Sequence, residues 1–143
     1  MSITMSQTKT YKGSCLCGGI HYQISEPFKV FQYCHCSRCQ KVTGSGFAPN
    51  VFVPLEQFKW LAGEELLGRY EIPDAKYFAT SFCKNCGSTM PWLTKTGTIY
   101  ILPVGTLDDK FAMQPSQSIF TDEIPPWHTS FDQLPKRPQG PRS

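Results

Sequence analysis

Three cysteines occupy one short stretch of the chain with a spacing that suits metal chemistry. Cys34, Cys36 and Cys39 form a C-x-C-x-x-C motif that places three thiols within six residues. Thiolates this close repel one another unless a cation or oxidation relieves the charge. The usual cation is zinc, which thiolates hold in a tetrahedron, and three ligands leave its fourth position open for chemistry. The motif therefore predicts a reactive zinc site.

The other four cysteines form two flanking pairs. Cys15 and Cys17 make a C-x-C pair followed by two glycines, and Cys83 and Cys86 make a C-x-x-C pair followed by Gly87. Glycine allows the tight turn that aims backbone amides at the sulfurs of a zinc knuckle. Together the two pairs can supply the four ligands of a closed structural zinc site. The seven cysteines thus divide into a closed set of four and an open set of three.

Spacing alone leaves other arrangements open. Cys36 and Cys39 could share a ribbon-like site with Cys83 and Cys86, although positions 40–82 make a longer spacer than the roughly 15–20 residues of an ordinary ribbon. The triplet could also be a redox switch, because clustered thiols form disulfides readily when metal is absent. It could instead be a second closed site. His35 is a poor candidate to close it, since neighbouring side chains of an extended segment point apart.

Composition and charge limit the possible partners. The chain has 143 residues, 40% of them hydrophobic and 17% charged, which suits one folded domain with a sizeable core. The net charge of +3 is mild, and no basic stripe of the kind that neutralises a phosphate backbone stands out. We therefore expect no nucleic acid partner. The sequence leaves the oligomeric state open.

The chain carries no recognisable targeting or membrane signal. Residues 1–10 lack the basic-then-apolar layout of a secretory signal, and the longest apolar run, 99–104, is far shorter than the ~20 residues that span a bilayer. We expect a cytoplasmic protein with no membrane contact. Thiols stay reduced in that compartment, so seven cysteines indicate metal rather than disulfides.

Short apolar segments separated by turn residues predict an all-β domain with one or two helical turns. The alternation of Ile20, Tyr22 and Ile24 with polar residues is typical of a half-buried strand. Residues 37–43 are expected to form the helical turns, with Gly44 as the stop. Further strands are predicted at 28–33, 47–53, 58–62, 66–72, 77–82, 90–94, 98–104 and 118–121. We expect a flexible arm at 1–10, one domain at 11–134 and a flexible tail at 135–143.

Several motifs, taken in order, resemble one known family. They are the glycine-flanked C-x-C at 13–19, the triplet with Lys41 and Gly44 after it, the C-x-x-C block at 82–88, the Gly-Thr-Leu-Asp run at 105–108 and the stretch at 119–127. This pattern is similar to the glutathione-dependent formaldehyde-activating enzymes, a family that also includes centromere protein V. The resemblance extends over roughly residues 11 to 134.

The resemblance implies a compact, mainly antiparallel β fold with two zinc ions per chain. In the family pattern the structural zinc corresponds to Cys15, Cys17, Cys83 and Cys86, and the reactive zinc to Cys34, Cys36 and Cys39. It also implies a carbon–sulfur lyase that acts on a thiol–aldehyde adduct, with glutathione and formaldehyde as namesake substrates. The alternatives are a non-enzymatic, zinc-stabilised binding module and a thiol redox sensor. Position 40 is Gln in this chain, whereas the family usually has Arg there. If that Arg holds an anionic substrate in the family, we expect the substrate of this protein to differ.

The remaining candidates give weaker signals. Arg38 and Lys41 flank the triplet and would favour an anionic thiol such as glutathione, or would simply be solvated. We expect the histidines at 21 and 128 to lie at the surface and the tryptophans at 60 and 92 to belong to the core.

Overall fold

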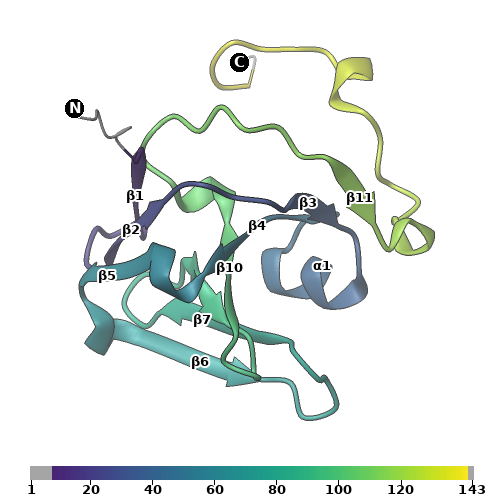
Figure 1. The fold of residues 1–143 in the computed structure, drawn as a ribbon. Coiled ribbons are helices and arrows are strands. Elements are labelled where there is room, and N and C mark those ends of the chain that lie inside the picture. The colour runs from purple at the N-terminus through teal and green to yellow at the C-terminus, as the bar shows by residue number, and fades with distance from the viewer. Residues whose placement is uncertain (1–7, 142–143) are drawn as a thin grey trace, which may run out of the picture.

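Short strands and tight turns dominate the computed structural model, which describes residues 8–141 (Figure 1). The described part contains one α-helix, α1 (Ser37–Thr43), and five single-turn 3₁₀ helices. Every strand pairing but one is antiparallel, the exception being the parallel pair β11 and β3. The all-β prediction is therefore confirmed.

Within residues 8–141, eleven strands form three sheets. The first sheet has the order β1 (Thr10–Ser14), β2 (His21–Ser25), β5 (Phe58–Ala62). The second has the order β11 (Gln117–Ile119), β3 (Phe31–Cys34), β4 (Ala48–Pro54), β10 (Ile99–Pro103), β9 (Trp92–Leu93). The third has the order β6 (Leu67–Glu71), β7 (Ala79–Cys83), β8 (Thr89–Met90).

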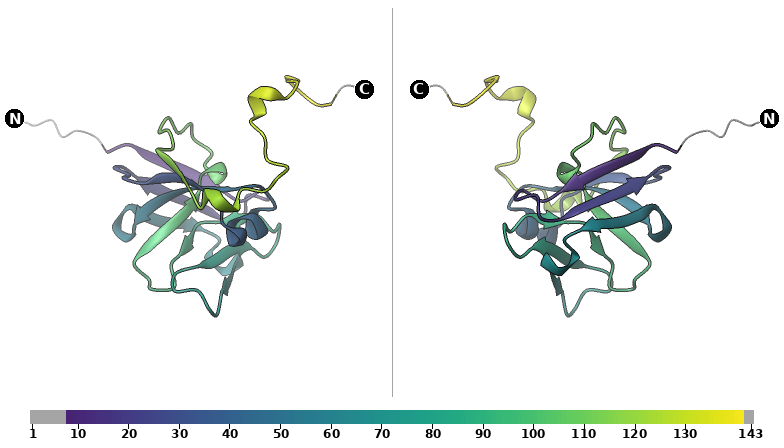
Figure 2. Two further views of the ribbon diagram at one scale, coloured as in Figure 1. Left: turned by 90° about the vertical axis from the view of Figure 1, so that its right-hand side faces the viewer. Right: turned by 90° about the vertical axis from the view of Figure 1, so that its left-hand side faces the viewer.

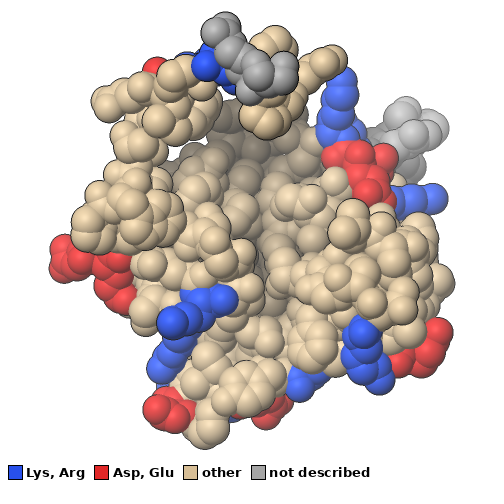
Figure 3. Space-filling view, turned by 180° about the vertical axis from the view of Figure 1, so that it is seen from behind, with Lys and Arg blue, Asp and Glu red and all other residues tan. Residues whose placement is uncertain are grey.

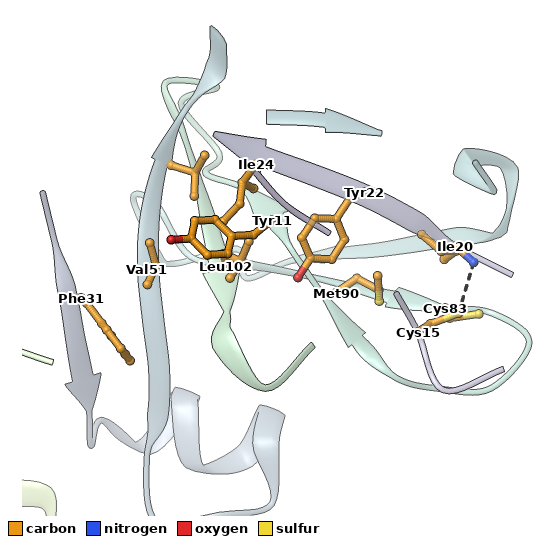
Figure 4. Packing of buried hydrophobic residues seen from close by; sticks show 11 residues of the cluster. Tyr11, Cys15, Ile20, Tyr22, Ile24, Phe31, Val51, Cys83, Met90 and Leu102 are labelled. Atoms are coloured by element: carbon orange, nitrogen blue, oxygen red, sulfur yellow. Dashed lines mark hydrogen bonds between the residues drawn. The ribbon is translucent and has the colours of Figure 1, made fainter. Parts of the chain in front are cut away.

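The five-stranded sheet uses its two faces differently. Successive side chains of a strand point to opposite faces. Phe31, Val51 and Leu102 point into the main core, where they pack with Tyr22 and other apolar side chains (Figure 4). Cys34 of β3, Ala48 of β4 and Ile101 of β10 belong instead to two smaller clusters on the opposite face. That second face carries the candidate site.

Helix α1 has the boundaries that the sequence predicted. The sulfur of Cys36 caps its N-terminus by accepting a hydrogen bond from the backbone N–H of Cys39 at 3.3 Å. Gly44, with φ 67°, ends the helix by donating its backbone N–H to the carbonyl of Gln40. A left-handed residue at this position is a common helix stop that favours glycine.

Two details of the strand prediction were wrong. Residues 10–14 were not expected to form a strand, yet β1 pairs with β2, and Gly13 lies opposite Tyr22 with no room for a Cβ beside that ring. The strand expected at 90–94 is two short strands in different sheets, β8 and β9, separated by Pro91. Proline has no N–H to donate to a ladder, so the chain leaves one sheet there and enters another.

The C-terminal segment lies largely at the surface. After β11 it contains the 3₁₀ turns η4 (Thr121–Glu123) and η5 (Phe131–Gln133), and nearly all residues of 120–141 are exposed. Figure 2 shows its later part standing away from the sheets. The prediction of an arm at 1–10 falls mainly on residues 1–7, outside the described range, and Thr10 already belongs to β1. The predicted domain limits stay a prediction.

Charged side chains are dispersed on the face shown in Figure 3, where Lys and Arg are separated by uncharged surface and accompanied by Asp and Glu.

Among the described residues, no helix has both the length and the apolar character needed to cross a bilayer.

Candidate metal centre

The structure gathers the seven cysteines into two clusters. Cys15, Cys17, Cys83 and Cys86 form one of them, and Cys34, Cys36 and Cys39 form the other. Within each cluster the sulfur atoms all lie within 4.8 Å of one another, so each can hold a metal ion. The ribbon-like pairing of Cys36 and Cys39 with the last C-x-x-C does not occur. The division into four and three therefore agrees with the preferred interpretation of the sequence.

The four-cysteine cluster joins the turn after β1 to the turn after β7. The sulfur of Cys17 lies 3.6 Å from that of Cys15 and 3.8 Å from that of Cys83. A tetrahedral ion with zinc–sulfur bonds of about 2.3 Å places its sulfurs about 3.8 Å apart, so this donor set fits zinc. Cys15 and Cys83 are buried at one end of the main core (Figure 4). This position suits a structural ion.

Backbone amides surround these four sulfurs. The N–H of Ile20 donates to the sulfur of Cys15 at 3.3 Å, drawn as the dashed line in Figure 4. The N–H of Cys17 donates to the sulfur of Cys86 at 3.4 Å. Contacts with Ser88 lower the pKa of the Cys86 thiol to about 5. Such donors stabilise thiolates, which are the form that binds zinc.

The three-cysteine cluster forms where strand β3 turns into helix α1. Cys34 is the last residue of β3, Cys36 is the N-cap of α1, and Cys39 lies in the first turn of that helix. Cys34 and Cys39 are buried, whereas Cys36 is partly exposed. The change of direction at the helix start brings the three sulfurs together, although the segment itself is short.

Interactions among the three thiols shift their pKa values in different directions. A hydrogen bond with the Cys39 thiol lowers the pKa of Cys34 to about 6. The same bond, together with burial and the charge of Cys34, raises the pKa of Cys39. Burial raises the pKa of Cys36. These shifts favour ionisation of Cys34 over that of Cys36 and Cys39, and a bound cation would favour the thiolate form of all three.

A cavity of about 750 Å³ opens beside this cluster and is lined by all three of its cysteines. None of the four cysteines of the other cluster lines it. Its floor is the second face of the five-stranded sheet, and its walls come from α1, η4 and residues 76–78. The lining is mainly apolar and aromatic, with the side chains of Arg38, Lys76 and Glu123 among the polar ones. The three-cysteine cluster therefore faces a space large enough for a small molecule.

Gln40 and Glu123 attach the C-terminal segment to this cluster. The carboxylate of Glu123 accepts the backbone N–H of Ser37 at 2.9 Å, at the start of α1. The side-chain amide of Gln40 donates to the carbonyl oxygens of His35 and Glu123, both at 2.9 Å. Gln40 does not line the cavity, so this residue acts as a structural tie. Nothing in the sequence pointed to Glu123, because 83 positions separate it from Gln40 and no local pattern marks it.

His35 lies apart from the cluster, as the alternation of side chains predicted. It is 3% exposed, its Nδ1 has no hydrogen-bond partner within the described residues, and its ring centroid lies 5.6 Å from that of Phe47. His21 and His128 are exposed, as expected. Trp60 packs against the core, and Trp92 is buried but also lines the cavity, which the sequence did not indicate. Arg38 lines the cavity, whereas Lys41 is exposed outside it.

Comparisons with known proteins agree with this architecture. A curated relative, an uncharacterized lyase of Schizosaccharomyces pombe, is 33% identical over 82 residues, which are 56% of this chain and 55% of the relative. The match thus spans about half of that relative's length. A crystal structure of a Rhodobacter sphaeroides protein has a TM-score of 0.59 at 20% identity and covers 75% of this chain and 98% of its own, which shows a shared fold.

The family comparison covers both cysteine clusters. The model of the family described as glutathione-dependent formaldehyde-activating enzyme matches residues 10–123, which contain all seven cysteines. This span is well over half of the chain, and it confirms the resemblance drawn from the motifs. The chain belongs to the family of glutathione-dependent formaldehyde-activating enzymes.

Proposed function

We propose that this protein is a zinc-dependent carbon–sulfur lyase that acts on a thiol–aldehyde adduct of the S-(hydroxymethyl)glutathione type. The observation that carries the proposal is the difference between the two cysteine clusters. The three-cysteine cluster opens onto the 750 Å³ cavity, whereas the four-cysteine cluster is packed against the core and does not line that space. A site with three protein ligands and access to small molecules is typical of catalytic zinc.

Cys34, Cys36 and Cys39 would hold the reactive ion, and the other four cysteines would hold a structural one. When bound, zinc supplies a Lewis-acidic centre that favours the thiolate form of an incoming thiol at neutral pH. In the reaction the thiol sulfur attacks the aldehyde carbon and forms a carbon–sulfur bond. The carbonyl π electrons move to the oxygen, which takes up the proton lost by the thiol. The reverse reaction breaks the same bond and returns the thiol and the aldehyde.

The residues around the cavity have separate tasks in this proposal. The apolar side chains of Phe52, Trp92 and Ile101 limit the access of water to the reacting groups. Arg38 and Lys76 place positive charge in the cavity lining, which suits the carboxylates of an anionic thiol such as glutathione. Glu123 is engaged with the Ser37 amide at the start of α1, so it is not a free base.

Cys36→Ser tests the proposal with little expected damage to the fold. Serine is a favoured N-cap, so it can replace the Cys36 sulfur in capping α1 while removing one thiolate. In zinc-reconstituted wild type we expect two zinc ions per chain by elemental analysis, and one in Cys36→Ser. We also expect the variant to lose adduct formation and cleavage, measured by nuclear magnetic resonance with glutathione and ¹³C-formaldehyde.

Lys41→Ala is the matched control, because Lys41 is exposed on the same helix and lies outside the cavity lining. It should keep both the zinc content and the activity of wild type. One zinc in both wild type and Cys36→Ser would contradict the proposal and favour a redox role for the triplet. If wild type holds two zinc ions and Cys36→Ser holds one, but wild type shows no activity, the result would favour the zinc-stabilised binding module.

A further inference from the structure

Two amide side chains lie next to each other on the floor of the cavity. Gln32 of β3 and Asn50 of β4 are direct partners in the antiparallel register, and both line the cavity. Gln32 is 9% exposed and Asn50 is 8% exposed. Most of the surrounding floor is apolar, so these two polar side chains are surrounded by hydrophobic surface.

The hydrogen-bonding groups of this pair are largely unused by the protein. The oxygen of the Gln32 side chain accepts a bond from the side chain of Gln117 at 2.8 Å. Within residues 8–141, the NH₂ group of Gln32 and the side-chain amide of Asn50 form no hydrogen bond with another residue. Neither amide is among the fully buried polar groups without a partner, so the unpaired groups are reached from the cavity and are available to a ligand.

The sheet register orders the floor into three successive rows. Cys34 pairs with Ala48 in the first row, and Gln32 pairs with Asn50 in the second. Phe52, two residues beyond Asn50 on the same face of β4, pairs with Ile101 of β10 in the third row. Successive rows on one face of a sheet are about 7 Å apart.

The three rows define the shape of a matching ligand. Its sulfur would lie at the cysteine cluster, an amide group within a few bonds of the sulfur would meet Gln32 and Asn50, and an apolar group would extend over Phe52 and Ile101. Beside Ile101, Trp92 of β9 continues the apolar row. An amide is the complementary partner for Asn50, because each has one carbonyl acceptor and an N–H donor.

We infer that the thiol partner of this enzyme is a cysteinyl amide with an apolar substituent, and that Asn50 determines this specificity. The inference rests on the proposed function for the position of the sulfur. Glutathione has the cysteinyl amide but ends in charged groups, so it fits the first two rows and leaves the third unused.

Three thiol probes separate the contributions of the rows. N-acetylcysteine benzylamide has the amide and an apolar ring, 4-phenylbutanethiol has the ring without the amide, and glutathione has the amide without the ring. Each is titrated calorimetrically into the zinc-reconstituted protein. We expect wild type to bind the benzylamide about tenfold more tightly than either of the other two, as two additional hydrogen bonds or one buried ring would provide.

Asn50→Leu and Phe52→Ala should affect different sets of probes. Asn50→Leu, similar in size, should weaken benzylamide binding about tenfold and leave 4-phenylbutanethiol unchanged or tighter. Phe52→Ala should weaken binding of both ring-bearing thiols more than it weakens binding of glutathione. Asn50→Ala replaces Asn50→Leu if the leucine variant does not fold, and thermal unfolding checks each variant.

The outcomes distinguish this inference from the proposed function. If thiols bind wild type but Asn50→Leu leaves the ratio of benzylamide to phenylbutanethiol affinity unchanged, the amide pair does not select the substrate and only the inference is overturned. Tighter binding of glutathione than of the benzylamide would also overturn it alone, because charge at the cavity would then dominate. If no thiol binds wild type, the proposed function fails together with the inference.

Discussion

Replacing Cys83 by serine should damage the fold far more than replacing Cys36. Cys83 is fully buried, belongs to both the four-cysteine cluster and the main core, and ends the central strand of the third sheet. A serine hydroxyl stays protonated at neutral pH, so Cys83→Ser would remove one thiolate ligand of the proposed structural zinc and leave a hydroxyl among apolar side chains. Cys36 lies in the separate three-cysteine cluster, and its capping bond survives in the serine variant.

The size of the effect follows from the energetics of structural zinc. Such an ion contributes about 10–16 kcal/mol in small zinc-folded peptides, whereas the net stability of a domain is about 5–15 kcal/mol. If Cys83→Ser loses only half of the lower zinc figure, the loss is about 5 kcal/mol. For a chain of this length each kcal/mol lowers the Tm by about 3–5 °C, so we expect a decrease of about 15–25 °C or complete unfolding.

Thermal unfolding of the zinc-reconstituted proteins, followed by circular dichroism, measures this difference. Wild type, Cys83→Ser and Cys36→Ser are compared under the same reducing conditions, with zinc content determined on each sample. We expect the Tm of Cys36→Ser to stay within about 5 °C of wild type. A Cys83→Ser protein that is well folded with a Tm near that of wild type would refute the assignment of the structural site.

Two further substitutions test the packing of the main core and the attachment of the C-terminal segment next to the site. Gly13→Ala places a Cβ against the ring of Tyr22 and should reduce stability by about 1–3 kcal/mol, whereas Gly105→Ala, which meets no atom within 4 Å, is the control in chemical denaturation. Equal stability losses for the two alanine variants would contradict the predicted overlap. Gln40→Ala removes both bonds that tie Glu123 and His35 together and should cost about 1–2 kcal/mol. Faster hydrogen exchange at the Ser37 amide should accompany that loss, and unchanged exchange would show that Gln40 is not the tie.

The sequence predicted much of the fold because the signals are local. The alternation of Ile20, Tyr22 and Ile24 indicated β2, and Gly44 indicated the end of α1. The sequence did not indicate strand β1, because glycine at position 13 is typical of a turn. In the structure Gly13 instead leaves space for the ring of Tyr22 across the hairpin. Such a contact between strands has no signature in either strand alone.

The sequence by itself determined which cysteines can act together. The triplet converges because Cys34, Cys36 and Cys39 lie within one strand-to-helix turn, and each flanking pair lies within one tight turn. Which pairs share a cluster was open to spacing arguments, and the family resemblance pointed to the arrangement that the structure has. The proximity of side chains that are a few residues apart can be predicted from the sequence, because the short segment between them keeps them close in space.

Only the tertiary structure decided what the three-cysteine cluster faces. The cavity is built from strands, turns and a helix spread from Gln32 to Glu123, and its three-row floor depends on the register of β3, β4 and β10. A shift of one residue in that register would move Asn50 to the core face and remove it from the cavity. Register is set by the packing of the whole sheet. No local sequence pattern therefore indicates that Gln32 and Asn50 lie side by side next to the cysteine cluster.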